Sequence, residues 1–476
     1  MKKNAPILIA IAIFSFIFFI AIGVDFSPLL RGPAPYPPDW QWPYLFTNTI
    51  HRLWFPAIMV VIMVLFVLQI EKYSDNNIDK KRVIFLFFAV VLHFLFQMGV
   101  LFFSRAGIGV LIQRIIHPDM NGYFTTALSV NNISQFLATY NNSVLGFAMH
   151  ATGHPPGSIL FFWLVNQLSV LLIPLQHLVS SIHFSHSDVQ AIWQTLTLSQ
   201  KTGAVASAGL IPLLSSLSLP LLYVLGKELY SVRAGIRAVF LYMVVPSITL
   251  FIPLSDVFFP LFSLSSFLLL VKGLKEKKEP MIFFSGLVFF IGLFFSTSLL
   301  PLSVLFGYFI LLYSYKKKTL GINAVLFKGI PYALGLLVLP VILFLFFNFN
   351  SLDVAKTLMK GLPKGRLYHV WVFYNLYDFF VFTGIPLFLL YLKMLWDRVK
   401  DHLFIAFTIM LLLLNFSGAV RGEVGRIWMP FMSMLVLFVS SFLTKNLKIS
   451  RNHFACIVIL QAIQILVMQE FWVPLW

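Results

Sequence analysis

The sequence predicts an all-α integral membrane protein, a polytopic bundle of about 13 transmembrane helices with one large extracytoplasmic loop. The chain of 476 residues is 59% hydrophobic and contains 53 Phe, whereas only 11% of its residues are charged. Apolar runs of membrane-spanning length recur along the whole chain, which no soluble domain of this size shows. One interval of about a hundred residues, 104–203, does not have the character of successive spans, and we call it the outer segment.

Each apolar run is long enough, or nearly so, to cross a bilayer as a helix, in which the backbone groups bond within the segment. The first run follows Lys2 and Lys3 like a signal peptide, but it is too long for a typical one, so we expect an uncleaved first span. In chain order the expected spans are 6–24, 53–70, 83–103, 204–225, 237–254, 257–271, 281–296, 300–313, 331–347, 378–394, 403–417, 429–443 and 454–470.

The basic residues predict the orientation. With a cytoplasmic N-terminus and alternating spans, most of the 34 Lys and Arg fall in inner segments, as the positive-inside rule requires. The net charge of +17 therefore indicates orientation among membrane lipids and not nucleic-acid binding, and we expect a multi-pass protein of a cell membrane, most simply a bacterial plasma membrane. The inner clusters lie at 2–3, 72–82, 227–237, 272–278, 316–328, 393–400 and 445–451.

Residues 158–174 are apolar but are not counted as a span. Counting them would move the clusters at 272–278 and 316–328 outside, against the charge rule. We therefore expect them to lie along the membrane interface or to re-enter it, or to form a hairpin with 178–200 as its return leg.

Three regions follow from this division. Residues 1–82 hold two spans and a loop, 25–52, whose Pro density forbids regular helix and whose Trp and Tyr suit the membrane interface. Residues 83–271 hold the outer segment and a central core, and residues 272–476 hold a C-terminal bundle with basic outer loops.

Asp119 is the first candidate for chemistry. It lies in the outer segment beside His117 and shortly before Tyr123, where a carboxylate could take a proton from an acceptor hydroxyl. The alternative is that Asp119 only caps a helix that begins near Tyr123, since Asp followed by Asn-Gly is common in turns.

His154-Pro155-Pro156-Gly157 is a more specific pattern, because two prolines fix the backbone on one side of the imidazole. His150 lies four residues earlier, and the alternative is a rigid turn with an incidental His. A divalent cation is possible, since His and Asp are zinc ligand types. The spacings of His117, Asp119, His150 and His154 match no metal motif, so we expect metal-independent chemistry.

Asp256 lies in a very short outer loop between two expected spans. A lone carboxylate there is costly unless it is wet or paired, which makes it either a functional residue or a cap of the next span. Arg421, Glu423 and Arg426, with the basic loop at 356–366, form a positive outer rim that suits a phosphate, with a Glu423–Arg426 pair fixing the arginine. Attraction to anionic lipid or wall polymer is the alternative. The substrate-binding candidates are Tyr123, His150, Lys364, Arg366, Arg421, Glu423 and Arg426.

Several of these patterns occur together in one known family. Residues 104–260 resemble the GT-C superfamily of membrane glycosyltransferases, and within it the protein O-mannosyltransferases and lipid A aminoarabinose transferases. The usual acidic pair of the family is Asp119-Met120 here, with the second acid missing. The residues that carry the resemblance are Asp119, Tyr123 and Ala127, the His154-Pro155-Pro156-Gly157-Ser158 turn, the segment 226–234 with Gly226, Lys227, Arg233 and Ala234, then Pro246 and Asp256, and the loop 421–428.

The resemblance implies an extracytoplasmic, inverting transferase. In such an enzyme the acid of the first outer loop is the base, basic side chains hold the phosphate of a polyprenyl-phosphate sugar donor, and the acceptor is a lipid, a glycan or a protein. Asp119, His154 and Asp256 are the catalytic candidates. The alternatives are a transporter or flippase for a lipid-linked or anionic solute, or a cell-wall polymer polymerase or ligase.

Overall fold

In a computed structural model, residues 5–36, 39–73, 75–316, 322–360 and 365–472 are described. Within those ranges the chain is helical, and its β-structure is confined to an isolated antiparallel bridge between Tyr44 and Trp472. Seven of its helices are long and apolar enough to cross a membrane, or up to nine if each of two bent pairs is one span. This arrangement is compatible with a multi-pass membrane protein, while the total of about 13 spans stays a prediction.

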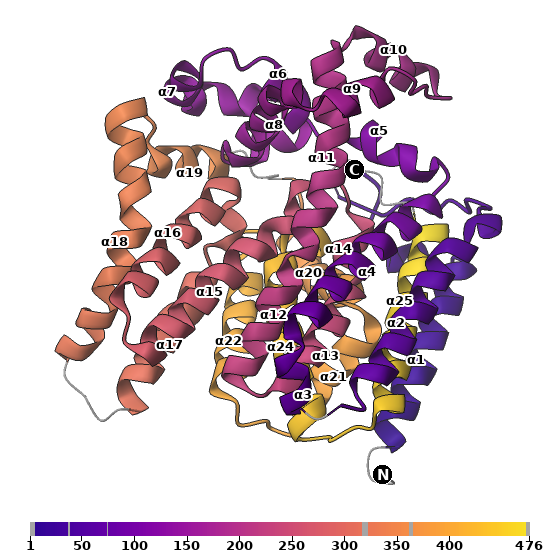
Figure 1. The fold of residues 1–476 in the computed structure, drawn as a ribbon, viewed down its shortest axis with the longest axis vertical. Helices are drawn as coiled ribbons and strands as arrows, with labels where there is room; N and C mark the ends of the chain where they lie inside the picture. Colours follow the sequence, from indigo (N-terminus) through magenta and orange to yellow (C-terminus); the bar gives the residue numbers. More distant parts are fainter. Residues whose placement is uncertain (1–4, 37–38, 74, 317–321, 361–364, 473–476) are drawn as a thin grey trace.

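The helices fall into four consecutive groups along the chain (Figure 1). The first group is α1 Ala5–Gly23, α2 Trp54–Ile70, α3 Asp75–Lys80 and α4 Arg82–Phe102. The outer segment holds α5 Val110–Ile116, α6 Tyr123–Leu128, α7 Ile133–Ser143, α8 Gly157–Leu168, α9 Ile173–Val179, α10 Ser187–Thr195 and the first residues of α11. The core continues with α11 Leu198–Ser216, α12 Ser218–Leu229, α13 Val232–Met243, α14 Pro246–Leu250 and α15 Phe259–Glu276. The last group is α16 Glu279–Phe295, α17 Leu302–Lys316, α18 Ile322–Phe347, α19 Ser351–Lys360, α20 Tyr368–Thr383, α21 Ile385–Trp396, α22 His402–Ser417, α23 Val424–Ile427, α24 Met429–Lys445 and α25 Arg451–Phe471.

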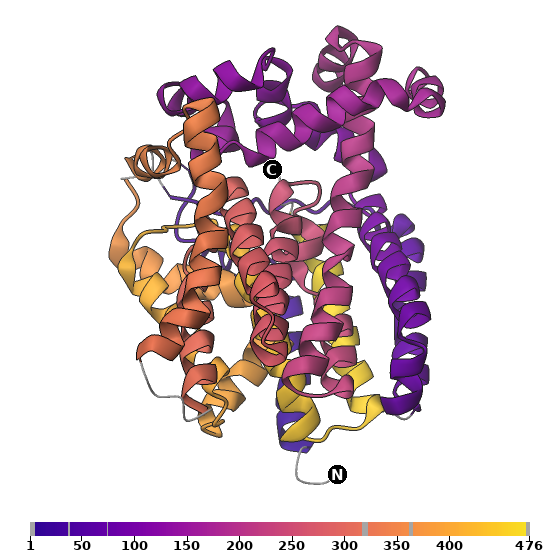
Figure 2. The ribbon, with the colours of Figure 1, turned by 60° about the vertical axis from the view of Figure 1, so that its left-hand side comes forward.

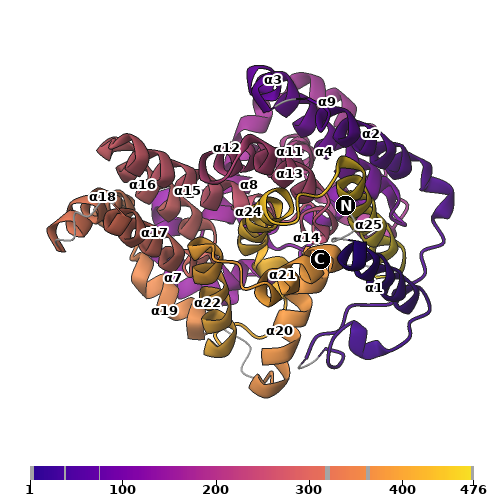
Figure 3. The same cartoon turned by 90° about the horizontal axis from the view of Figure 1, so that it is seen from below.

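Helix α24 is the centre of the bundle. Every residue from Met429 to Leu443 is buried, so α24 is apolar on all sides, as expected for a helix enclosed by others. It packs against α12, α13, α15 and α21, and Figure 3 shows it surrounded by them when the bundle is seen from below.

The outer segment lies together at one end of the bundle. Figures 1 and 2 show α5 to α10 above the helix ends, on the side opposite the N-terminus. The expected span-length stretch at 158–174 is not one straight helix there, because Gly157–Leu171 and Ile173–Val179 meet at 99°. This geometry agrees with a segment that does not simply cross the bundle, as the charge distribution predicts.

The opposite end of the bundle gathers basic residues, and we call it the basic end. Arg237 pairs with Glu71 at 2.9 Å and Lys227 pairs with Asp79 at 2.7 Å, so the segments 71–82 and 227–237 are joined there. Arg237 also donates to the carbonyl oxygens of Leu443 and Ile449, which brings the 445–451 cluster to the same end. These basic clusters therefore lie on one side, as expected. The middle of the 316–328 cluster lies outside the described residues.

Two expected spans are interrupted, which corrects the sequence prediction. The span at 378–394 is bent by 116° at Gly384, whose φ is +111°, just before Pro386. The backbone groups that the bend leaves without helical partners bond to two glutamines of α25. Gln464 accepts from the Ile385 N–H at 2.8 Å and donates to the Val381 carbonyl, and Gln461 donates to that of Thr383. The span at 237–254 is likewise divided into α13 and α14 just before Pro246.

The loop between α1 and α2 is attached to the end of the last helix. The backbone N–H of Leu45 donates to the carbonyl of Phe471 at 3.0 Å. The buried carboxylate of Glu470 accepts from the hydroxyls of Thr47 and Thr49, both at 2.7 Å. As its Pro content predicts, the described residues of 25–52 form no α-helix, and their regular structure is two 3-10 turns and the bridge at Tyr44.

Candidate active site

A buried ion-pair chain lies at the outer-segment end of the bundle, with Arg426 at its centre. Arg426 pairs with Asp256 at 3.4 Å and with Glu423 at 2.8 Å, and Glu423 also pairs with Arg366 at 3.5 Å. The Arg426 and Asp256 side chains are only 3% and 2% exposed, so both charges are removed from water. Burial of a charge is costly unless an opposite charge pairs with it. The expected Glu423–Arg426 pair is present, and it offsets part of the cost of burying Arg426.

The loop that carries Arg426 is held in place by α20. The Gly422 N–H donates to Asn375 and the Gly425 N–H donates to Asp378, at 3.0 and 2.8 Å. The Ser247 hydroxyl of α14 donates to the Gly425 carbonyl. A Cβ at Gly425 would overlap the ring of Phe382, so the close approach of this loop to α20 requires glycine. Glu423 itself has a left-handed φ of +60°, which directs its carboxylate between the two arginines.

The loop that carries Asp256 is held from the outer segment. Arg114 of α5 donates to the carbonyl oxygens of Leu250 and Ile252, at 3.1 and 2.6 Å, so it satisfies backbone groups just before Asp256. The hydroxyl of Ser158 in α8 bonds to that of Ser255 at 2.8 Å. The alternative role of Asp256 as a helix cap is wrong, because neither the 3-10 helix at Ser255–Phe258 nor α15 has a side-chain cap.

Tyr123 and His154 of the outer segment interact electrostatically with Asp256 and Arg426 of the ion-pair chain. Their rings meet edge to face at 5.6 Å, and their side chains are almost fully buried. The Tyr140 hydroxyl donates to the His154 carbonyl at 2.7 Å, and the two prolines that follow lead into α8, so the backbone of His154 is fixed on both sides. The Tyr123 hydroxyl and His154 Nδ1 are buried without a hydrogen-bond partner within the described chain. Buried polar atoms in this condition call for a further hydrogen-bond partner, such as an ordered water or a ligand.

The electrostatics of these groups agree with one shared site. Burial lowers the pKa of His154, while the nearby Asp256 opposes that effect, so the imidazole is neutral at neutral pH. Burial and then Asp256 raise the pKa of the Tyr123 phenol, which keeps its proton available for donation. Burial disfavours the charged form of Arg426, but Asp256 and Glu423 outweigh burial and raise its pKa. Burial and then the positive charge of Arg426 lower the pKa of His150, which places His150 near the same site.

Asp119 does not join this group. Its side chain is exposed, and its carboxylate makes no hydrogen bond or ion pair with the described chain, while its backbone N–H donates to His117 at 3.3 Å. A helix does begin at Tyr123 as expected, but the predicted Asp119 cap is wrong. The residue before that helix is Gly122, with φ of +76°, and the Tyr123 N–H donates to the side chain of Asn121.

The remaining predicted binding residues have different surroundings. Arg421 and Arg366 each donate to the backbone carbonyl of the other, at 2.8 and 2.7 Å, and Arg421 lies over the ring of Tyr368, at the edge of the ion-pair chain. Arg366 is 5% exposed and lies over the ring of Trp371, so it belongs to the buried part. Lys364 lies outside the described residues.

No known protein family has a model that matches this chain, and no curated protein matches it. The site is therefore interpreted from its own geometry. Within the described residues, no three His, Cys, Asp or Glu side chains come together as ligands for a metal ion.

Sequence reasoning missed the residues that support the site. Asn375 and Asp378 are buried polar side chains, and their polarity in or beside an apolar run was the available signal. Asp378 also accepts from the indole N–H of Trp42 at 3.2 Å, which joins the loop 25–52 to the same support. Arg114 carried no comparable signal, because its partners are backbone carbonyls far away in sequence.

Proposed function

We propose that this protein is an extracytoplasmic glycosyltransferase that transfers a sugar from a polyprenyl-phosphate donor to a lipid, glycan or protein acceptor. One observation carries the proposal. A buried carboxylate, Asp256, lies beside a buried guanidinium, Arg426, and two buried polar atoms of the outer segment, the Tyr123 hydroxyl and His154 Nδ1, have no hydrogen-bond partner within the described chain. Glycosyl transfer from a lipid phosphate needs these three components, namely a base, a cation for the leaving phosphate and donors for the sugar.

Arg426 is the proposed phosphate ligand. A guanidinium binds two phosphate oxygens at once, and Glu423, at 2.8 Å, fixes the direction in which that of Arg426 points. Arg366 extends the positive charge on the other side of Glu423. In the proposed reaction the bond between the anomeric carbon and the phosphate oxygen breaks, and these cations stabilise the charge left on that phosphate.

Asp256 is the carboxylate that the geometry favours as the base. When a donor phosphate replaces Asp256 as the partner of Arg426, the Asp256 carboxylate becomes available to accept the proton of the acceptor hydroxyl. The hydroxyl oxygen then forms the new bond to the anomeric carbon from the face opposite the phosphate, which inverts the configuration there. Asp119, which is exposed in the outer segment, is the alternative base, because the family resemblance implies it in this role.

Substrate access requires the outer segment to move, because the proposed groups are covered in this structure. Tyr123 is fully buried and His154 is 8% exposed. A donor that reaches Arg426 displaces the packing around these two side chains and gives the Tyr123 hydroxyl and His154 Nδ1 the hydrogen bonds they lack.

The test is sugar transfer from a radiolabelled polyprenyl-phosphate donor in membranes that contain the full chain, with Asp256→Asn, Asp119→Asn and Asp188→Asn compared. Asp188 is a matched control, since it is a carboxylate of the same outer segment whose side chain is 65% exposed. We expect Asp256→Asn to lower the rate by about a hundredfold or more, as loss of a general base does. The control should keep the rate of the parent protein.

The outcomes separate the candidates. A full loss in Asp119→Asn with an unchanged rate in Asp256→Asn would transfer the role of base to Asp119. If the parent protein moves a lipid-linked solute across proteoliposomes and makes no covalent product, the carrier hypothesis replaces this proposal. Product chain length distinguishes transfer of one sugar from polymerisation.

A further inference from the structure

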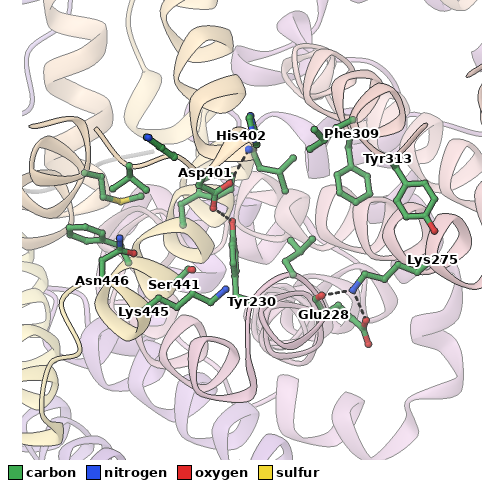
Figure 4. A pocket seen from close by; sticks show the side chains of 18 residues that line it. Glu228, Tyr230, Lys275, Phe309, Tyr313, Asp401, His402, Ser441, Lys445 and Asn446 are labelled. Atoms are coloured by element: carbon green, nitrogen blue, oxygen red, sulfur yellow. Dashed lines mark hydrogen bonds and ion pairs between the residues drawn. The ribbon is translucent and has the colours of Figure 1, made fainter. Parts of the chain in front are cut away.

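A pocket lies at the basic end of the bundle, away from the ion-pair chain. Its volume is about 700 Å³, and it opens between α12, α15, α17, α21, α22 and α24 (Figure 4). The two sites are separated by the length of α24, because Arg426 precedes its first residue and Lys445 is its last. At 1.5 Å per residue this separation is roughly 24 Å, so the pocket is not part of the proposed active site.

The carboxylates of this pocket already have partners. Glu228 pairs with Lys275 at 3.0 Å. Asp401 accepts from the Tyr230 hydroxyl at 2.7 Å, and its other oxygen accepts from the N–H groups of Leu403 and Phe404, which caps α22. Burial and then Asp401 raise the pKa of Tyr230, so the phenol remains the donor in that bond.

Two lysines of the pocket wall have no such carboxylate. Lys445 lies over the ring of Tyr230 at 5.0 Å and Lys400 is exposed beside Asp401, and within the described chain neither makes an ion pair. Figure 4 shows Lys445 and Tyr230 on one side of the pocket and the Lys275–Glu228 pair on another. Asp401 has only neutral hydrogen-bond donors as partners, so its charge must be counted as well. Lys275, Lys400 and Lys445 against Glu228 and Asp401 leave the wall with a net charge of 3 − 2 = +1, which favours an anionic ligand.

Besides the polar His402, Ser441 and Asn446, the wall has a large apolar part. It includes Phe309, Leu312, Met394 and Phe438 from α17, α21 and α24. A free phosphate ion would occupy only a small part of this volume and would leave these side chains facing water. A ligand that joins an anionic phosphate ester to a hydrocarbon chain uses both parts of the wall.

We propose that this pocket binds the phosphate headgroup of an anionic membrane lipid, with an acyl chain against the apolar wall. Lys400 and Lys445 hold the phosphate, and the aromatic and aliphatic side chains of α17 and α24 hold the chain. The charge distribution predicts that the basic end faces the cytoplasm, where anionic lipids attract basic residues close to a membrane surface.

The experiment measures lipid binding by native mass spectrometry of the purified full chain in detergent. Phosphatidylglycerol, zwitterionic phosphatidylcholine and soluble glycerol phosphate are titrated against the parent protein and the double variant Lys400→Gln/Lys445→Gln. Lys72→Gln is the matched control, because Lys72 is an exposed lysine of the same end that does not line the pocket. Leu312→Trp fills the apolar part and leaves both lysines in place.

We expect one tightly bound phosphatidylglycerol per chain, about tenfold or more weaker binding in the double variant and in Leu312→Trp, and unchanged binding in Lys72→Gln. Equal binding of phosphatidylcholine, or an equal loss in Lys72→Gln, would overturn the proposal. If glycerol phosphate binds as tightly as the lipid, the ligand is a soluble phosphate and the lipid source is wrong. Should the double variant fail to fold, Lys445→Gln alone must weaken binding by about threefold.

Discussion

His154 shows how one side chain links the sequence pattern to the chemistry of the site. The prolines after it fix its backbone, the Tyr140 hydroxyl bonds to its carbonyl, and its imidazole is buried beside Tyr123. Because burial lowers the pKa of His154, the folded state holds it neutral at a pH where the unfolded chain would be partly protonated. This single residue therefore connects acidity to stability.

Acidification should destabilise the protein through His154. With the folded pKa below the ordinary 6.5, the unfolded state binds more protons, so the stabilising contribution is complete above pH 6.5 and is lost as the pH falls below it. The free energy of unfolding should drop by at most about 1.4 kcal/mol per pH unit through this group. Thermal unfolding of the detergent-solubilised chain between pH 8 and pH 5 measures the slope.

The control for this prediction is the exposed pair of histidines in the same outer segment. His154→Gln should lower the slope of the acid limb of the stability profile, whatever its effect at pH 8, and should leave the part that belongs to His150, whose pKa burial also lowers. His183→Gln/His186→Gln removes two exposed imidazoles, and it should leave the slope unchanged. An acid limb that is as steep in His154→Gln as in the parent protein would assign the pH dependence to other groups.

The bend between α20 and α21 is the element on which the candidate site depends most. Helix α20 supplies Asn375 and Asp378, which bond to the loop that carries Arg426. The direction of α20 is set at Gly384, where the side-chain amide of Gln461 occupies the space a Cβ would take. Local backbone geometry some 40 residues earlier in the chain thus positions the guanidinium of the site.

Gly384→Ala should destabilise the chain and impair the proposed transfer reaction together. The substitution places a side chain at φ of +111° and against Gln461, which costs about 1–3 kcal/mol for the backbone alone. Thermal unfolding and the transfer assay measure the two effects. Gly307→Ala is the matched control, because nothing lies within 4 Å of an added Cβ in that helical position, and it should be neutral or slightly stabilising.

At the scale of the whole molecule, the hydropathy pattern of the sequence predicted the fold more accurately than the individual motifs predicted the site. An all-helical bundle, the gathering of basic clusters at one end and the set-apart outer segment could be predicted, because each depends on composition over many residues. The bend at Gly384 could not, since the glutamines that satisfy it lie about 80 residues away in sequence. The sequence pattern also suggested that His154, Asp256 and Arg426 belong to one site. It could not predict that Asp119 lies apart from them or that Asp378 supports the loop of Arg426, because both depend on tertiary contacts.

The predicted orientation is tested by labelling single cysteines on the two ends. In a Cys456→Ser background, Asp188→Cys marks the outer segment and Lys72→Cys marks the basic end, and both positions are exposed. A membrane-impermeant maleimide should label Asp188→Cys in intact cells and Lys72→Cys only after permeabilisation, because the positive-inside rule places the basic end in the cytoplasm. The reverse pattern would place the ion-pair chain on the cytoplasmic side and remove the basis for an extracytoplasmic reaction.

The attachment of the loop 25–52 to Glu470 and Phe471 has a consequence for biogenesis. The threonines at 47 and 49 leave the ribosome more than 400 residues before their carboxylate partner, so the loop cannot settle while the chain is being inserted. The hydrogen bond from Trp42 to Asp378 likewise cannot form until Asp378 has been synthesised. The loop 25–52 is therefore completed only once α25 has been synthesised, and a nascent chain halted before α25 would present this loop to proteases and quality-control factors in an open form.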